Sequence, residues 1–124
     1  MSTDDAFGPI ELSADGRYLI VYEFQFPTME EFRAMLAELV ATAKRAHVRH
    51  VLYDARAMNT PFSLTQAFAF GEAFADIVPP SFCVALLVID DFPNRHFLET
   101  VAINRRSHLK YFTDRDQALV WLFT

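Results

Sequence analysis

The chain has 124 residues, the length of one ordinary domain, and 52% of them are hydrophobic against 22% charged. This composition excludes a disordered or low-complexity chain and predicts a substantial buried core. The net charge is -5, and acidic and basic residues are interspersed along the chain. Because no basic stripe is available to neutralise a run of phosphates, we expect no nucleic-acid partner. We expect a single domain over residues 1–124.

The N-terminus, the apolar runs and the single cysteine together indicate where the protein is located. Asp4 and Asp5 stand where a signal peptide would carry basic residues, and no long apolar segment follows them. The longest apolar runs, such as residues 82–89, are too short to span a bilayer. Cys83 lies inside that run and has no cysteine to pair with, so we expect a packed thiol. A cytoplasmic protein without a membrane span is expected.

A β-hairpin is predicted at the start of the chain. Residues 10–13 and 17–26 form its two arms, and the Asp15-Gly16 pair between them can adopt the positive φ angles of a tight turn. Alternation along the second arm puts one strongly apolar set on one face: Tyr18, Ile20, Tyr22, Phe24 and Phe26. The opposite face carries Leu19, Val21, Glu23 and Gln25.

The first helix is predicted from its capping residues and its periodicity. Thr28 can cap the free amides at the start of the helix, and Glu31, three residues later, can reach back to it. Apolar residues then recur at helical spacing to about Ala46, with charged residues on the rest of the circumference. The pattern predicts an amphipathic helix that packs on a sheet.

The remaining chain alternates between strands and helices. Residues 48–53 and 82–89 are predicted to be buried strands, and a helix over residues 63–78, stopped by Pro79-Pro80, connects them. Residues 94–106 are predicted to be a third helix, residues 109–112 a strand, and residues 113–123 a last helix. The order ββαβαβαβα predicts an α/β fold. We expect a single mixed sheet, with an N-terminal hairpin and parallel later strands, packed with four helices.

This element order, together with three local patterns, resembles the SpoIIAA-like branch of the STAS superfamily. The patterns are the segment His50-Val51-Leu52-Tyr53-Asp54-Ala55-Arg56, Ser63 at the start of the next helix, and Tyr111-Phe112 followed by Ala118-Leu119-Val120-Trp121-Leu122. The resemblance implies a small regulatory domain that is not an enzyme. The related SEC14-like folds bind lipids, so by analogy the resemblance also leaves open a hydrophobic ligand.

Ser63 has two compatible interpretations. With Gln66 three residues later it can form a capping box, which stabilises a helix by roughly 1 kcal/mol. In the anti-sigma-factor antagonists of the superfamily, a serine at about this place is phosphorylated by a partner kinase. A phosphate on Ser63 would meet free backbone amides and the positive end of the helix dipole. This chain reads Thr60-Pro61-Phe62-Ser63-Leu64, which departs from the Asp-Ser-Ser-Gly-like motif of those proteins.

Carboxylates follow two of the predicted strands. Asp54 and Asp90 come directly after the apolar runs and could converge near Arg56 at the carboxyl end of a parallel sheet, where ligands gather. Such a cluster could hold a divalent metal, although Asp is also common at strand ends because it favours turns. The four histidines show no zinc-ligand spacing. We expect no catalytic residue, metal or cofactor, and keep a metal-assisted enzyme using Asp54 and Asp90 as a minor alternative.

The helix over residues 63–78 is apolar around more of its circumference than one contact with a sheet requires, in a chain with 13 phenylalanines. A second apolar contact is therefore expected, and it is open whether it is core, subunit interface or ligand pocket. An interface or a pocket would be formed by Met58, Phe62, Phe70, Phe74 and Ile77. The leading hypothesis is a regulatory interaction module that pairs with itself or with another protein. The alternative is a carrier of an apolar small molecule or lipid.

Overall fold

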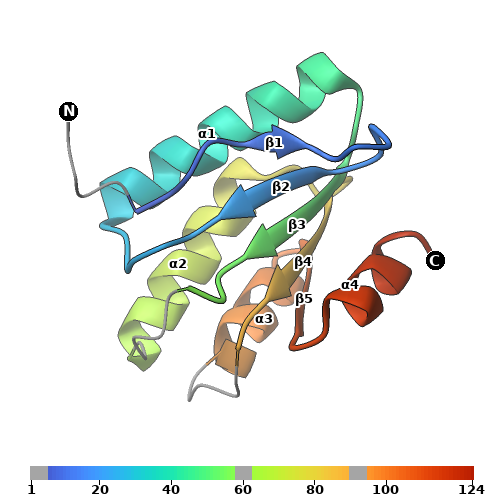
Figure 1. Cartoon of the computed structure of the whole chain (residues 1–124). Coiled ribbons are helices and arrows are strands. Elements are labelled where there is room, and N and C mark those ends of the chain that lie inside the picture. The colour runs from blue at the N-terminus through green and yellow to red at the C-terminus, as the bar shows by residue number, and fades with distance from the viewer. Residues whose placement is uncertain (1–5, 58–62, 90–94) are drawn as a thin grey trace.

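The computed structural model describes residues 6–57, 63–89 and 95–124. Strands and helices alternate in the predicted order, ββαβαβαβα, which confirms the expected fold class (Figure 1). The elements are β1 (Glu11–Leu12), β2 (Leu19–Tyr22), α1 (Met29–Ala46), β3 (His50–Asp54), α2 (Leu64–Ile77), β4 (Cys83–Leu87), α3 (Arg95–Asn104), β5 (His108–Phe112) and α4 (Arg115–Leu122).

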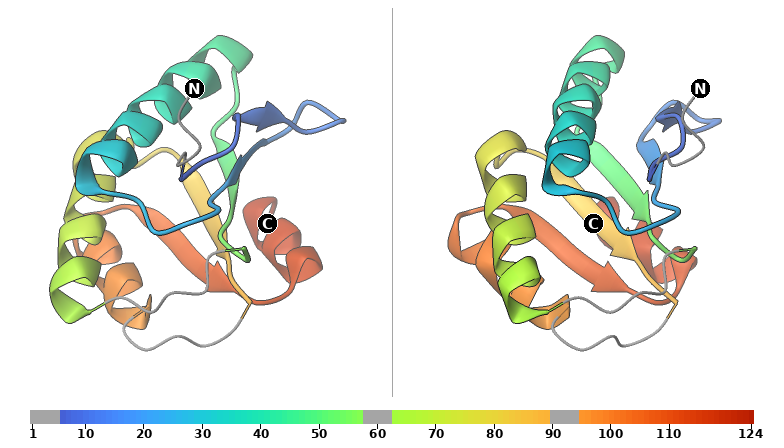
Figure 2. Two further views of the ribbon diagram at one scale, coloured as in Figure 1. Left: turned by 60° about the vertical axis from the view of Figure 1, so that its left-hand side comes forward. Right: turned by 90° about the vertical axis from the view of Figure 1, so that its left-hand side faces the viewer.

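The sheet has five strands in the spatial order β1-β2-β3-β4-β5, the same as their order in the chain. The first pair is antiparallel, and every later pair is parallel. Successive crossovers of one hand between neighbouring parallel strands place α1, α2 and α3 on the same face of the sheet. Figure 2 shows these three helices on one side and α4 on the other.

The helix start predicted at Thr28 is confirmed. The turn between β1 and β2 also lies at Asp15-Gly16 as predicted, although of this pair only Gly16 has a positive φ angle, 73°, which glycine adopts more readily than other residues. At the start of α1, the hydroxyl of Thr28 accepts from the amide of Glu31, and the Glu31 carboxylate accepts from the amide of Thr28. Both features depend on neighbouring residues alone, which is why the sequence predicts them well.

The alternation predicted for β2 is confirmed over residues 18–21, but both of its faces are buried, and not only the strongly apolar one. Leu19 and Val21, on the face predicted to be the less apolar one, are fully buried in the main core between the sheet and helices α1 to α3. Tyr18 and Ile20 face the opposite way and belong to a second buried cluster, which α4 covers. Helices cover both faces of the sheet, and side chains on both faces of β2 are therefore buried. Phe24, predicted on the apolar face, is 51% exposed.

Candidate functional site

The polar residues of the site lie at the carboxyl end of β2 and β3, where the parallel strands finish (Figure 1). Asp54 is the last residue of β3 and is 7% exposed. Its carboxylate accepts from the guanidinium of Arg56 through two nitrogens, with the Nη2–Oδ2 distance at 2.8 Å and Nε–Oδ1 at 3.0 Å. The hydrogen bond from its guanidinium to the Asp54 carboxylate raises the pKa of Arg56.

Asp54 also shapes the local turn, because its Oδ1 accepts from the backbone amide of Arg56 at 3.0 Å. The structure therefore brings Asp54 and Arg56 together as expected. The two side chains pair with each other, and Asp54 also stabilises the turn that follows β3, a role that aspartates at strand ends often have. Asp90, the third member of the expected polar site, lies outside the described residues, as do Met58 and Phe62. In the described ranges, no group of three or more metal-ligating side chains occurs.

A buried carboxylate that the sequence did not single out lies next to this pair. Glu23 follows β2 directly and is only 6% exposed. The phenol of Tyr53 on β3 donates to Oε1 of Glu23 over 2.5 Å, and the amide of Glu23 donates to the carbonyl of Asp54 over 2.9 Å. Phe7 packs edge-on against the Tyr53 ring, with 6.2 Å between the ring centroids. Glu23 and Tyr53 thus form a polar pair inside an otherwise apolar core.

Burial perturbs the protonation of this pair. Removal from water raises the pKa of Glu23 to about 7, and the hydrogen bond from Tyr53 acts in the opposite direction by favouring the carboxylate. Burial also raises the pKa of Tyr53 well above its ordinary value, and the charge of Glu23 adds to the rise. Tyr53 is therefore a phenol and hydrogen-bond donor at neutral pH, while Glu23 changes its charge near neutral pH.

The position of Glu23 on a buried face could have been found from the sequence. Glu23 is two residues from Val21 and four from Leu19, so alternation already places it on their face of the strand. That face was predicted to be the less apolar one, and an acid was unremarkable there. Only the packing of α1 to α3 over this face makes the acid buried. The partner Tyr53 was part of an apolar run and carried no sign of a polar role.

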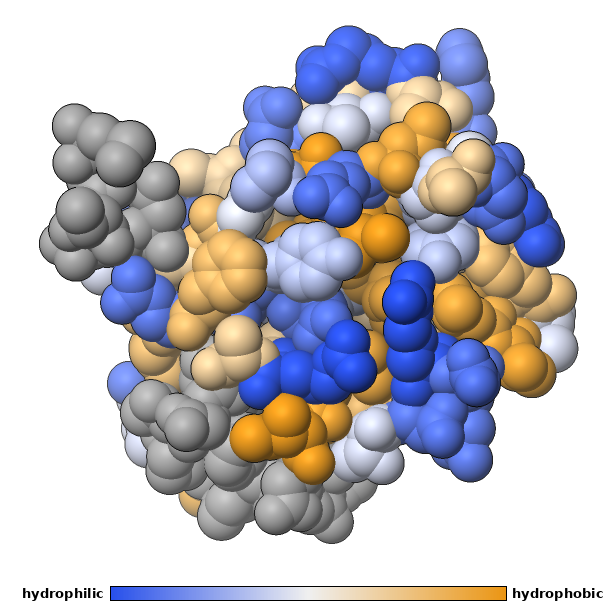
Figure 3. All heavy atoms as spheres, in the orientation of Figure 1, coloured by the Kyte–Doolittle hydropathy of each residue, from blue (hydrophilic) through white to orange (hydrophobic). Residues whose placement is uncertain are grey.

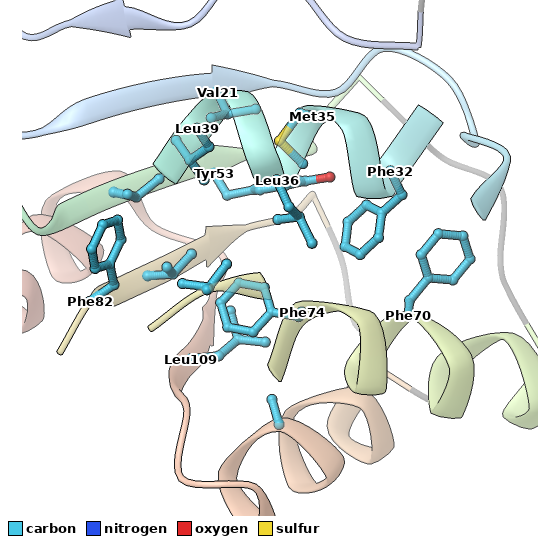
Figure 4. Close-up of a cluster of buried hydrophobic side chains, with 14 of the residues drawn as sticks. Val21, Phe32, Met35, Leu36, Leu39, Tyr53, Phe70, Phe74, Phe82 and Leu109 are labelled. Atoms are coloured by element: carbon cyan, nitrogen blue, oxygen red, sulfur yellow. The ribbon is translucent and has the colours of Figure 1, made fainter. Parts of the chain in front are cut away.

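The expected surface on α2 is wrong for its two central aromatics. Phe70 and Phe74 are 9% and 3% exposed, and Figure 4 shows both among the side chains of the main core. Phe70 makes edge-to-face contacts with Phe26 and Phe32, with ring centroids 5.5 and 4.8 Å apart. Ile77 is half-buried against the same cluster. These residues therefore form core and not a free surface or an open pocket.

The wide apolar arc of α2 follows from its position. α2 contacts both α1 and α3, and in Figure 2 it lies between them on the sheet. A central helix in such a layer packs against the sheet below and a helix on each side, so more than one stripe must be apolar. The second contact that the sequence predicted is thus intramolecular.

The first half of α2 nevertheless exposes apolar side chains. Leu64 is 55% exposed and Phe68 is 43% exposed, and Ser63 beside them is exposed as well. Ser63 forms the predicted capping box: its hydroxyl accepts from the amide of Gln66 over 3.1 Å, and Gln66 Oε1 accepts from the amide of Ser63 over 2.9 Å. The exposed large apolar side chains of α2 therefore lie in its first half, within five residues of Ser63.

Two solved structures resemble the fold over their whole length. One is an uncharacterised protein of the DUF3478 family with a SpoIIAA-like fold from Shewanella loihica PV-4, which is 22% identical, with a TM-score of 0.59 and 98% of each chain covered. The other is an anti-sigma factor antagonist from Mycobacterium paratuberculosis, which is 13% identical, with a TM-score of 0.59 and 100% of each chain covered. No known family model and no curated protein matches the sequence.

The chain therefore has a SpoIIAA-like α/β fold, as the local sequence patterns predicted. At these identities the likeness establishes the fold. In the described part of the chain, no helix has both the length and the apolar character needed to cross a bilayer.

Proposed function

We propose that this protein is a non-enzymatic regulatory module that binds a protein partner, in the first instance a second copy of itself, through the first half of α2. The observation that carries the proposal is the exposure of Leu64 and Phe68 within five residues of Ser63. Aromatic and large aliphatic side chains of this kind are enriched at the centre of protein interfaces. The likeness in fold to an anti-sigma factor antagonist supports a role exercised through protein contacts.

Ser63 supplies a means of regulating the contact in this proposal. A phosphate on its exposed hydroxyl would lie at the N-terminus of α2, where the backbone amides and the helix dipole favour negative charge. The same phosphate would add charge beside Leu64 and so disfavour an apolar contact there. Phosphorylation of Ser63 would then release the partner while leaving the helix folded.

Sedimentation equilibrium and native mass spectrometry of the purified protein test the proposal. We expect a dimer at about 50 μM that Phe68→Asp converts to a monomer, because a buried unpaired carboxylate is costly at an interface. The matched control is Val120→Asp, which introduces the same charge at a 63% exposed apolar residue on α4 and should leave the dimer intact. Circular dichroism checks that both variants are folded.

Each result bears on a separate part of the proposal. A wild-type protein that stays monomeric up to about 500 μM would rule out self-association. A dimer that both Phe68→Asp and Leu64→Asp leave intact would place the interface elsewhere. Ser63→Asp, as an imitation of the phosphate, is expected to weaken the dimer, and Ser63→Ala is expected to preserve it.

A further inference from the structure

A hollow of about 590 Å³ lies at the opposite end of the sheet from Glu23 and Ser63. Its lining residues come from the end of α1, from the chain that enters β3 and from the chain between α2 and β4. Figure 1 shows where these segments lie in the fold. The size of the hollow falls within the range of small-molecule sites, which is roughly 300 to 1,000 Å³. The hollow shares no residue with the proposed partner surface on α2.

The lining of the hollow combines cations with an apolar wall. Lys44, His47 and Arg49 supply the polar side, and Val48, Pro79 and Phe82 supply the apolar side. Among the described residues that line it, none is acidic. In a chain with a net charge of -5, the two positive side chains of Lys44 and Arg49 around one hollow reverse the overall charge locally. Positive charge in a concave site attracts and retains an anion.

The basic side chains are available for a ligand. In the part of the chain that the structure describes, neither Lys44 nor Arg49 forms an ion pair, whereas four other arginines each pair with a carboxylate: Arg33, Arg45, Arg56 and Arg105. Lys44 is in the last turn of α1, where a cation also offsets the helix dipole. Arg49 lies beyond the helix and has no such role.

The backbone around the hollow does not oppose an anion strongly. The last carbonyl groups of α1 carry partial negative charge and would repel an anion. The carbonyls of Ala43 and Lys44, however, already accept hydrogen bonds from the residues that follow the helix, which reduces this repulsion. The amide of Val48 donates to the Ala43 carbonyl over 3.0 Å, and that of His47 donates to the Lys44 carbonyl over 3.3 Å. His47 achieves this with a left-handed backbone, at a φ angle of 58°.

We infer that this hollow binds a small organic anion, a molecule with a compact apolar body and one carboxylate, sulfonate or phosphate group. The apolar wall from Val48, Pro79 and Phe82 would take the body, and Lys44 and Arg49 would take the charged group. A polymer with many negative charges fits less well, because the rest of this acidic protein repels it.

The probe for this test is 8-anilinonaphthalene-1-sulfonate, which has an aromatic body and one sulfonate and fluoresces when it leaves water. We expect saturable binding of one molecule, about three- to ten-fold weaker in Lys44→Gln and in Arg49→Gln. The matched control is Lys110→Gln, which removes one positive charge from an exposed residue of β5 and should change the affinity less than about two-fold. The uncharged N-phenyl-1-naphthylamine should bind all four proteins alike.

Amide chemical shifts of the protein under titration with the same sulfonate locate the site. We expect the largest shifts at residues 44–49 and 81–82, the chain on both sides of the hollow. The inference is overturned if the sulfonate does not saturate, if the largest shifts lie elsewhere, or if Arg49→Gln and Lys110→Gln weaken binding equally. Circular dichroism of each variant separates a lost site from a lost fold. None of these results depends on the oligomeric state.

Discussion

Replacing Glu23 by Gln tests the buried carboxylate at the carboxyl end of β2. The amide of Gln keeps the size of the side chain and an oxygen that can accept from the Tyr53 phenol, but it cannot ionise. In the native protein the pKa of Glu23 is about 7, against an ordinary value of 4.5. The native state therefore binds this proton more tightly than the unfolded chain does.

The sign of the pH dependence follows from that difference. Below about pH 4.5 both states hold the proton, and Glu23 adds no pH dependence to stability. As the pH rises from 4.5 to about 7, the unfolded chain releases the proton before the native protein does, so the native state loses stability. At about 1.4 kcal/mol for each pKa unit, the upper limit of this loss is about 3 kcal/mol.

Urea unfolding at several pH values between about 4.5 and 8 measures this effect. We expect the free energy of unfolding of Glu23→Gln, minus that of the wild type, to increase by up to about 3 kcal/mol across that interval. Taking this difference between variant and wild type cancels the contributions of the other titrating groups, which both proteins share. Glu38→Gln, at a carboxylate whose side chain is 62% exposed, is the control and should follow the wild type. A difference that is constant with pH for Glu23→Gln would refute the assignment of a raised pKa.

Four further substitutions test Tyr53, the core at Phe70 with Phe24 as its control, and the helix cap at Ser63. Tyr53→Phe removes the hydrogen bond that favours the carboxylate, so the pKa of Glu23 should move above about 7, and an unchanged or lower value in a carboxyl NMR titration would contradict this. Phe70→Ala should lower the free energy of unfolding by about 3 to 5 kcal/mol because it leaves a cavity in the core. Phe24→Ala, at a half-exposed ring, should cost less than about 1 kcal/mol, and equal costs would show that Phe70 is not core. Ser63→Ala should cost about 1 kcal/mol in urea unfolding through the lost cap, and no loss would mean that the cap contributes little.

Local chemistry accounts for most of what could be predicted from the sequence. The capping boxes at Thr28 and Ser63 and the turn at Gly16 depend on residues within a few positions of one another. The alternation of apolar runs with amphipathic segments predicted the order of strands and helices, and chain connectivity then required parallel pairing in the later strands. These features need no knowledge of which helix lies on which face.

Contacts between distant segments decided the rest. α1, α2 and α3 cover one face of the sheet and α4 covers the other, so both faces of β2 are buried, and the three helices on the same face as Glu23 make it a core residue. The place of α2 between α1 and α3 makes Phe70 and Phe74 core side chains and leaves Leu64 exposed. The sequence shows which residues are apolar, and their periodicity shows which of them share a face. The segment that covers that face, however, lies elsewhere in the chain. Burial, and with it the pKa of a carboxylate, is therefore a property of the assembled layers.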